Sequence, residues 1–219
     1  MDDQLEGTRR RMMPGKVSAP AGNNKIVTRA QTYFEMQAQK GKLDAETTKA
    51  IQQGDMQFFD ADYYVRKQIN AGQTEILNSG NVKRVGTSNL DKNVLPELVN
   101  FVLDRVRLAW GTDAGTNVAA VNFSNAGSIP AAIANGELQI LLDDRPIVDI
   151  PASRFFINSA TATPNAVQGV SDTVQLESRR LIKPGQPLTI LFKCAEGITL
   201  PTGNHFVEVR LMGASNRKR

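Results

Sequence analysis

The strongest constraint on the fold is the frequency of chain-breaking residues after about residue 72. Glycine, proline, asparagine and aspartate recur there between short apolar or alternating runs, and the helical spacing of apolar residues is lost. This pattern is typical of short strands joined by turns, and it leaves no helix of the length that a doubly wound α/β fold needs. We therefore expect a mainly β fold, an antiparallel β-sandwich or jelly roll of about eight to ten strands. The expected strands are 74–77, 100–110, 118–123, 137–142, 147–150, 154–157, 173–176, 179–182, 188–193 and 206–212.

The run 100–110 illustrates the pattern. Alternate side chains over most of it are apolar, which indicates a half-buried antiparallel strand. The residues that we expect to share one face are Val102, Asp104, Val106, Leu108 and Trp110. The sequence DDRP at 143–146 lies between two apolar runs and predicts a tight hairpin turn.

The first third of the chain has a different character. Residues 1–24 contain frequent glycine and proline and no periodic apolar pattern, so we expect a flexible basic arm. Apolar residues at helical spacing predict a helix over 25–40 that ends near Gly41. A second short helix is expected after Asp44 as N-cap and before Gly54. The aromatic stretch 58–65 fits either a helix or a strand.

These patterns divide the chain into four parts. We expect a flexible basic arm at 1–24, a helical and aromatic extension at 25–71, a β-sandwich at 72–213 and a basic tail at 214–219. Aromatic side chains on the extension need somewhere to be buried, either on this sandwich or on a neighbouring molecule.

Positive charge gathers at the two ends of the sequence. The net charge is +4, and the basic clusters are Arg9, Arg10 and Arg11 and then Arg217, Lys218 and Arg219. Such clusters can bind nucleic acid or an acidic membrane surface, or they can serve only as solubilising ends. A further set of arginines is expected to point outward from the strands, where they either meet phosphates or pair with Glu137, Glu177 and Glu208. Those arginines are Arg105, Arg107, Arg179, Arg180 and Arg210.

Residues that would form a catalytic site are not recognisable in the sequence. It contains no phosphate-binding glycine loop and no nucleophile elbow, and its single histidine, His205, rules out a His-rich metal site. Cys194, the single cysteine, and His205 both alternate with apolar residues, which favours structural roles, although a pairing of the two across strands stays open. Asp143 and Asp144 are interpreted as turn residues rather than as a cation site. We expect no enzymatic activity and no cofactor.

Several stretches together resemble the jelly-roll capsid proteins of tailless icosahedral phages, including the membrane-containing kind. They are DYYVRK at 62–67, VKRVG at 82–86, NVLP at 93–96, the strand at 101–110, NGELQI at 135–140 and IKPGQPL at 182–188. The likeness covers roughly residues 58–213 and lies in the overall pattern rather than in one diagnostic motif. The chain departs from the membrane-containing phages whose major capsid protein has a double barrel, because its length allows only a single barrel.

The resemblance implies a self-assembling capsid subunit whose N-terminal arm links neighbouring subunits in a virion assembled in the host cytoplasm. Its partners would be further copies of itself and other virion proteins, with the genome or an internal membrane meeting the basic ends. The residues expected to contact a neighbouring subunit are Tyr33, Phe34, Phe58, Phe59, Tyr63 and Tyr64. The alternative is a β-sandwich module that binds carbohydrate or a host receptor. Exposed aromatic residues on the loops, such as Phe155 or Phe156, would favour it, but these two follow an apolar run and we expect them to pack inside.

Overall fold

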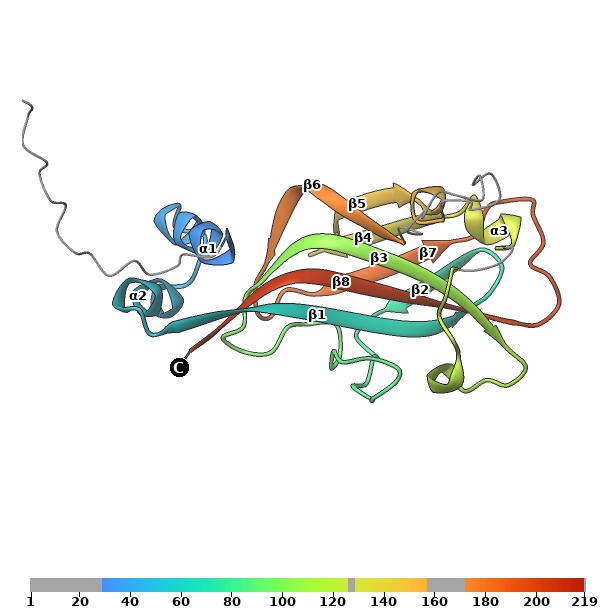
Figure 1. Cartoon of the computed structure of the whole chain (residues 1–219), viewed down its shortest axis with the longest axis horizontal. Coiled ribbons are helices and arrows are strands. Elements are labelled where there is room, and N and C mark those ends of the chain that lie inside the picture. The colour runs from blue at the N-terminus through green and yellow to red at the C-terminus, as the bar shows by residue number, and fades with distance from the viewer. Residues whose placement is uncertain (1–28, 126–128, 157–171, 219) are drawn as a thin grey trace, which may run out of the picture.

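The computed structural model describes residues 29–125, 129–156 and 172–218. Over these residues, eight strands form two four-stranded sheets in which every pairing is antiparallel (Figure 1). The expected mainly β fold and the β-sandwich are therefore confirmed. The strands are β1 (Met56–Ile69), β2 (Gln73–Leu77), β3 (Phe101–Asp113), β4 (Glu137–Leu142), β5 (Arg145–Pro151), β6 (Thr173–Ile182), β7 (Leu188–Lys193) and β8 (Asn204–Lys218).

The order of the strands alternates between the sheets. The first sheet has the order β1-β8-β3-β6, and the second has the order β2-β7-β4-β5. Four of the pairings join a strand counted from the first strand to the strand at the same count from the last. They are β1 with β8, β2 with β7, β3 with β6 and β4 with β5. The chain thus resembles one long hairpin, bent at the β4–β5 turn, whose paired arms lie alternately in one sheet and the other.

The turn at the centre of this hairpin agrees with the sequence prediction. Asp143 and Asp144 connect β4 to β5 and have φ angles of 50° and 59°. A two-residue hairpin turn of this kind needs positive φ at both positions, and aspartate tolerates that conformation better than most residues.

Both predicted helices are present in the described part of the chain, and residues 25–28 of the first prediction lie outside the described residues. The two helices are α1 (Arg29–Gln39) and α2 (Ala45–Gln53). The side chain of Asp44 accepts a hydrogen bond of 2.7 Å from the backbone of Thr47, and Gly54 ends α2 in the left-handed conformation at φ 78°. Three short elements complete the description, namely η1 (Val118–Ala120), α3 (Ala131–Ala134) and η2 (Ala152–Arg154).

Two of the predicted strands are absent. Residues 118–123 begin with the helical turn η1, in which the side chain of Asn117 caps the backbone of Ala119. Residue 154 lies at the end of η2, and residues 155 and 156 form no strand; residue 157 lies outside the described residues. In both places short apolar runs are packed by turns of helix, which apolar periodicity over so few residues cannot distinguish from strands.

The main core fills the space between the two sheets. Its largest fully buried side chains include Phe101, Leu103, Leu138, Ile140 and Phe192. A smaller apolar cluster lies on the outer face of the first sheet, where α1 and α2 cover one end of it (Figure 1). Phe34 of α1 is fully buried there and packs with Val102 and Phe58.

A β-bulge corrects the expected face of β3. The pairing of β3 shifts register between Leu103 and Arg105 on both of its neighbours. Before the bulge Leu103 faces the main core while Val102 faces the helices, and after it Val106 faces the main core. Val102 and Val106 are therefore on opposite faces, because an extra residue in a strand inverts the alternation that follows.

Strand pairing extends beyond both expected limits of the sandwich. β1 lies before residue 72 and pairs with β8 from Met56 to Ile69, and β8 continues past residue 213 to Lys218. Residues that we assigned to the extension and to the basic tail are thus parts of the first sheet. The aromatic stretch 58–65 is a strand because apolar material covers both of its faces, the core on one side and the helices on the other.

Candidate functional site

The bulge in β3 creates a polar site on the outer face of the first sheet. Leu103 pairs with Arg180 of β6, but Arg105 pairs with Gln175, so the intervening residues of β6 are not in register with β3. Bulges re-aim side chains and often lie at binding sites. Here the bulge places Asp104 on the outer face, where the interrupted strand β6 brings Arg179 beside it.

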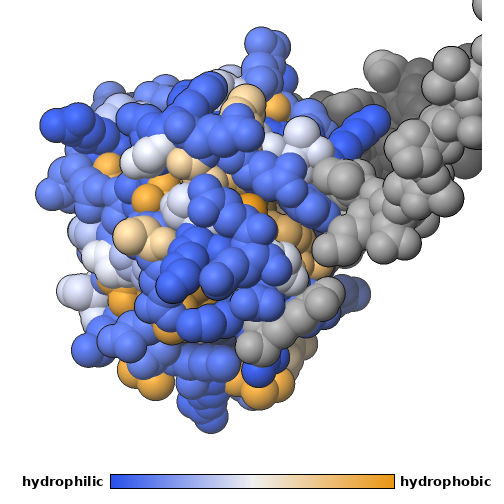
Figure 2. Space-filling model, turned by 90° about the vertical axis from the view of Figure 1, so that its left-hand side faces the viewer, coloured by the Kyte–Doolittle hydropathy of each residue, from blue (hydrophilic) through white to orange (hydrophobic). Residues whose placement is uncertain are grey.

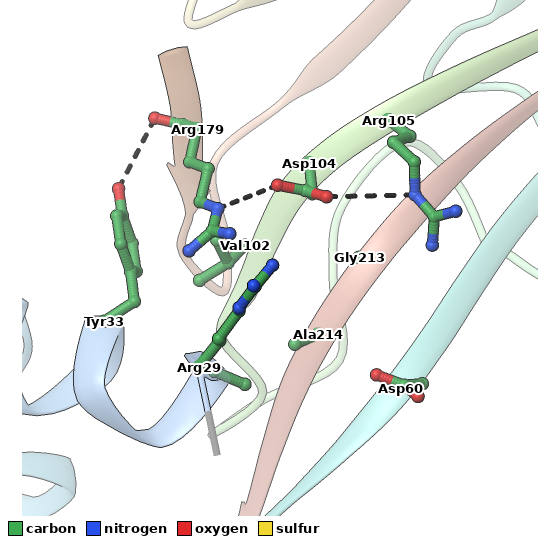
Figure 3. Close-up of a pocket in the computed structure, with 10 residues that line it drawn as sticks. Arg29, Tyr33, Asp60, Val102, Asp104, Arg105, Arg179, Gly213 and Ala214 are labelled. Carbon is green, nitrogen blue, oxygen red and sulfur yellow. Dashed lines mark hydrogen bonds and ion pairs between the residues drawn. The ribbon is translucent and has the colours of Figure 1, made fainter. Parts of the chain in front are cut away.

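A pocket of about 180 Å³ lies next to this bulge, between α1 and the outer face of the first sheet (Figure 3). Its floor includes Gly213 and Ala214 of β8 and Val102 of β3. A Cβ atom at Gly213 would lie 1.9 Å from the carbonyl oxygen of Val102, so only glycine allows the two strands to approach this closely. Charged side chains form much of the rest of the lining, namely Arg29, Asp60, Asp104, Arg105 and Arg179.

Asp104 contacts two of these arginines through the Nε atom of each. The Nε atom of Arg179 donates to one carboxylate oxygen of Asp104 at 2.7 Å, and the Nε atom of Arg105 lies 3.8 Å from the other. Gln175 donates a further hydrogen bond at 3.0 Å. Burial by itself would raise the pKa of Asp104, but the hydrogen bonds from Arg179 and Gln175 and the two positive charges outweigh it and lower that pKa.

Tyr33 ties α1 to this site. Its hydroxyl donates to the carbonyl oxygen of Arg179 at 3.4 Å, and the guanidinium of Arg179 lies 5.9 Å from the centre of its ring. Burial raises the pKa of the Tyr33 hydroxyl, although the charge of Arg179 opposes the shift. The phenol therefore stays protonated as a donor at neutral pH, and the position of α1 depends on the same arginine that Asp104 orients.

The outer atoms of the three arginines have no hydrogen-bond partner among the described residues. Arg105 and Arg179 use their Nε atoms for Asp104, and within the described ranges their Nη atoms have no hydrogen-bond partner. Arg29 has neither a hydrogen bond nor an ion pair with any residue that the structure describes, and its guanidinium points into the pocket in Figure 3. The arrangement can therefore donate several charge-assisted hydrogen bonds to an acceptor in the pocket.

A second polar cluster lies further along the same outer face. Glu208 of β8 is 1% exposed and contacts three arginines: Arg66 at 2.6 Å, Arg210 at 3.1 Å, and Arg107, which also contacts Asp172. Four of the five arginines predicted to point outward are thus in ion pairs rather than on an open basic face; Arg180 is in none within the described residues. Their acidic partners are Asp104, Asp172 and Glu208; Glu137 and Glu177 form no ion pair among the residues described.

Most of the basic terminal residues lie outside the described residues. This holds for Arg9, Arg10, Arg11 and Arg219. Arg217 is exposed on β8, and Lys218 donates a hydrogen bond of 2.8 Å to Glu46 of α2. That hydrogen bond and the charge of Glu46 raise the pKa of the exposed Lys218 ammonium.

Five of the six aromatic residues expected at subunit contacts are used within the chain. Phe34 and Phe58 stack at 5.3 Å, and Tyr33 is bonded to Arg179 as described above. The ring of Tyr63 meets that of Phe101 at 5.0 Å, and the hydroxyl of Tyr64 accepts a hydrogen bond from the backbone of Gly86 at 3.2 Å. The sixth, Phe59, is 40% exposed.

Cys194 and His205 have separate surroundings. The thiol of Cys194 donates a hydrogen bond to the carbonyl oxygen of Asn70 at 3.5 Å, and burial raises the pKa of that thiol. His205 is 4% exposed; its Nδ1 accepts from the indole of Trp110 at 3.4 Å, and its Nε2 lies 3.0 Å from the carbonyl oxygen of Pro201. Both residues are therefore packed structural groups with partners of their own.

Other candidate functions find little in the described residues to support them. Phe155 is fully buried and Phe156 is 7% exposed, so neither offers a stacking surface for a sugar. In the described ranges, no cluster of three or more potential ligand side chains could hold a metal ion. None of the described helices combines the length and the apolar composition needed to cross a membrane.

The sequence analysis missed the pocket beside Asp104. Arg29 was not singled out, and Asp104 was expected on an inward face. An aspartate among apolar residues was nevertheless a signal of irregularity, because a charge on a buried strand face needs a partner or a local change of direction. A scan against protein-family models finds no match to this chain, and a search of curated proteins finds none either.

Proposed function

We propose that this chain is a non-enzymatic structural protein of a virus, a self-assembling subunit of the icosahedral capsid of a phage. The proposal takes the β-sandwich to be a jelly roll. It takes the segment before α1 to be an arm that links neighbouring subunits in a virion assembled in the host cytoplasm. Its partners are other copies of this chain and other virion proteins, and the basic ends meet the genome or an internal membrane.

The observation that carries the proposal is the order of the strands. Eight strands in two four-stranded sheets, with β1 beside β8 and β4 beside β5, agree with a long hairpin wound into two Greek keys. Jelly rolls of this kind are common in viral capsids, but they also occur in lectins and cupins. A direct test of assembly distinguishes a capsid subunit from these other jelly-roll proteins.

The surface provides a second argument. Figure 2 shows the end of the molecule that carries α1 and α2, where hydrophobic residues lie scattered among hydrophilic ones. Several large apolar side chains are exposed in the described residues, notably Phe59, Val82, Val85, Leu98 and Ile198. Exposed side chains of this kind are available for contacts with neighbouring subunits, which a closed symmetric shell requires.

The length before α1 provides a third. Twenty-eight residues precede the first described residue, and a chain of that length can span at most about 90–100 Å. This exceeds the size of one sandwich domain, so the segment is long enough to reach an adjacent subunit. It also carries Arg9, Arg10 and Arg11, which could neutralise phosphates.

The test is the mass of the purified protein in solution, measured by light scattering over a range of concentrations. The full chain is compared with a variant that lacks residues 1–28 and so keeps every described element. We expect discrete high-order assemblies from the full chain and smaller species from the shortened one. Substitution of Phe59 by Ser should lower the assembled mass without lowering the melting temperature, because this side chain is already partly exposed.

One outcome would overturn the proposal. If the full chain stays monomeric at high concentration and in the presence of nucleic acid or anionic vesicles, a capsid subunit is excluded as the leading function. The chain would then be screened as a binding module against glycans and host receptors.

A further inference from the structure

We propose that the pocket beside Asp104 binds a phosphate group through Arg29, Arg105 and Arg179. This goes beyond the proposed role in a capsid and does not depend on it. The three arginines come from α1, β3 and β6, and all three line one hollow of about 180 Å³ (Figure 3). A space of that size accommodates one phosphate group together with some of its water.

The hydrogen-bonding pattern indicates that the arginines are arranged for a ligand. Asp104 accepts a hydrogen bond from Nε of Arg179, which orients that guanidinium group, and it forms a longer ion pair of 3.8 Å with Nε of Arg105. Their Nη atoms, and the whole guanidinium of Arg29, have no hydrogen-bond partner in the described part of the chain. Asp104 is thus a positioning residue for Arg179, and the outer edges of the three guanidinium groups are left for an acceptor with several oxygens.

The shape of the donor set favours phosphate over carboxylate. A planar carboxylate is satisfied by one bidentate arginine, whereas a phosphate monoester presents three acceptor oxygens and carries about −1.5 to −2 charges at neutral pH. Three guanidinium groups on three different elements match the three oxygens of a phosphate group better than the two oxygens of a carboxylate. A phosphodiester has one charge and fewer free oxygens, so it should bind more weakly than a monoester.

Asp60 provides a test of opposite sign. It lies on β1 at the rim of the pocket and forms no ion pair with any described residue. With two carboxylates against three arginines, the lining has a net charge of +1. Because the charge of Asp60 repels an anion, Asp60→Asn should strengthen binding, and a gain of affinity cannot be produced by misfolding.

The experiment is calorimetric titration of the full-length protein with inorganic phosphate at constant ionic strength. We expect saturable binding that Arg29→Gln weakens about tenfold, as expected for the loss of one charge-assisted contact. Asp60→Asn should strengthen it severalfold. Arg145→Gln is the matched control, since Arg145 is exposed on β5 in the other sheet and its loss removes the same charge. It should change the affinity less than about twofold.

Two further probes distinguish the sources of the phosphate group. Vesicles containing phosphatidic acid present a monoester headgroup, and a short single-stranded oligonucleotide presents diesters. If Arg29→Gln weakens vesicle binding more than Arg145→Gln does, the ligand is a lipid headgroup. If the protein binds inorganic phosphate but not the vesicles, the ligand is the free ion. Oligonucleotide binding that exceeds phosphate binding and depends on Arg29 overturns the monoester assignment. Absence of saturable phosphate binding, or equal weakening by Arg29→Gln and Arg145→Gln, overturns the proposal as a whole.

Discussion

Substitution of Glu208 by Gln should destabilise the fold more than removal of any exposed charge. Glu208 lies in the middle of β8 with 1% of its surface exposed and contacts Arg66, Arg107 and Arg210. Glutamine keeps the shape but removes the negative charge, so three guanidinium groups face one another with only Asp172 to balance them.

The size of the effect follows from the burial of the partners. Removing one member of a fully buried ion pair costs about 3–5 kcal/mol. The three arginines here are between 19% and 33% exposed, so water can partly solvate them and the lower end of that range applies. We expect a loss of about 3 kcal/mol, which for a domain of this size lowers the melting temperature by about 6–12 °C.

Urea unfolding followed by circular dichroism, together with calorimetry, measures both quantities. Glu137→Gln is the matched control because Glu137 is exposed on β4 and has no ion-pair partner among the described residues. It should change the free energy of unfolding by less than about 0.5 kcal/mol. If the two variants lose the same stability, the cluster around Glu208 contributes nothing specific and the argument from burial fails.

Three further changes test other parts of the structure. Gly213→Ala places a methyl group against the carbonyl oxygen of Val102 and should cost about 3 kcal/mol in urea unfolding; a cost below about 1 kcal/mol would show that the strands separate easily there. Phe34→Ala removes a fully buried ring and should cost about 3–4 kcal/mol of local stability, so hydrogen exchange should accelerate in α1 but not in β4 of the second sheet; acceleration in both would contradict separate clusters. The pKa of Asp104 is lowered in the folded state, so its stabilising contribution is complete above the ordinary value of 3.8 and is lost as the pH falls through the folded-state value. Asp104→Asn should therefore reduce the loss of stability on acidification, and an unchanged acid limb in pH-dependent unfolding would refute the role of its arginine contacts.

Local rules explain which features could be predicted from the sequence. The Asp44 cap, the Gly54 stop and the turn at Asp143 and Asp144 depend on a few neighbouring residues, and the structure confirms all three. The stretch containing Phe58 and Tyr63 was ambiguous because a strand with apolar cover on both faces shows no alternation.

The candidate site could not be predicted in the same way. Its charged residues are far apart in the sequence, and Arg29 and Arg179 line the same pocket only because α1, through Tyr33, lies beside the part of β6 that leaves its register with β3. The bulge at Asp104 directly follows the apolar residues Phe101–Leu103, and each of those three residues is compatible with either face of the strand. Neighbouring residues therefore do not determine which side chains of this strand face the main core. That choice depends on the packing of Val102 against Phe34 in the second apolar cluster.

The position of β8 has a consequence for how the protein must fold. β8 is the final strand in the series, yet it lies inside its sheet between β1 and β3. The partners in the β1–β8 ladder are 136 to 162 positions apart, so forming it closes a very long loop and should be slow. A nascent chain on the ribosome would hold β1 and β3 without their shared neighbour until residues 204–218 emerge. During that interval both strands present open hydrogen-bonding edges, and premature association with other chains competes with completion of the sheet.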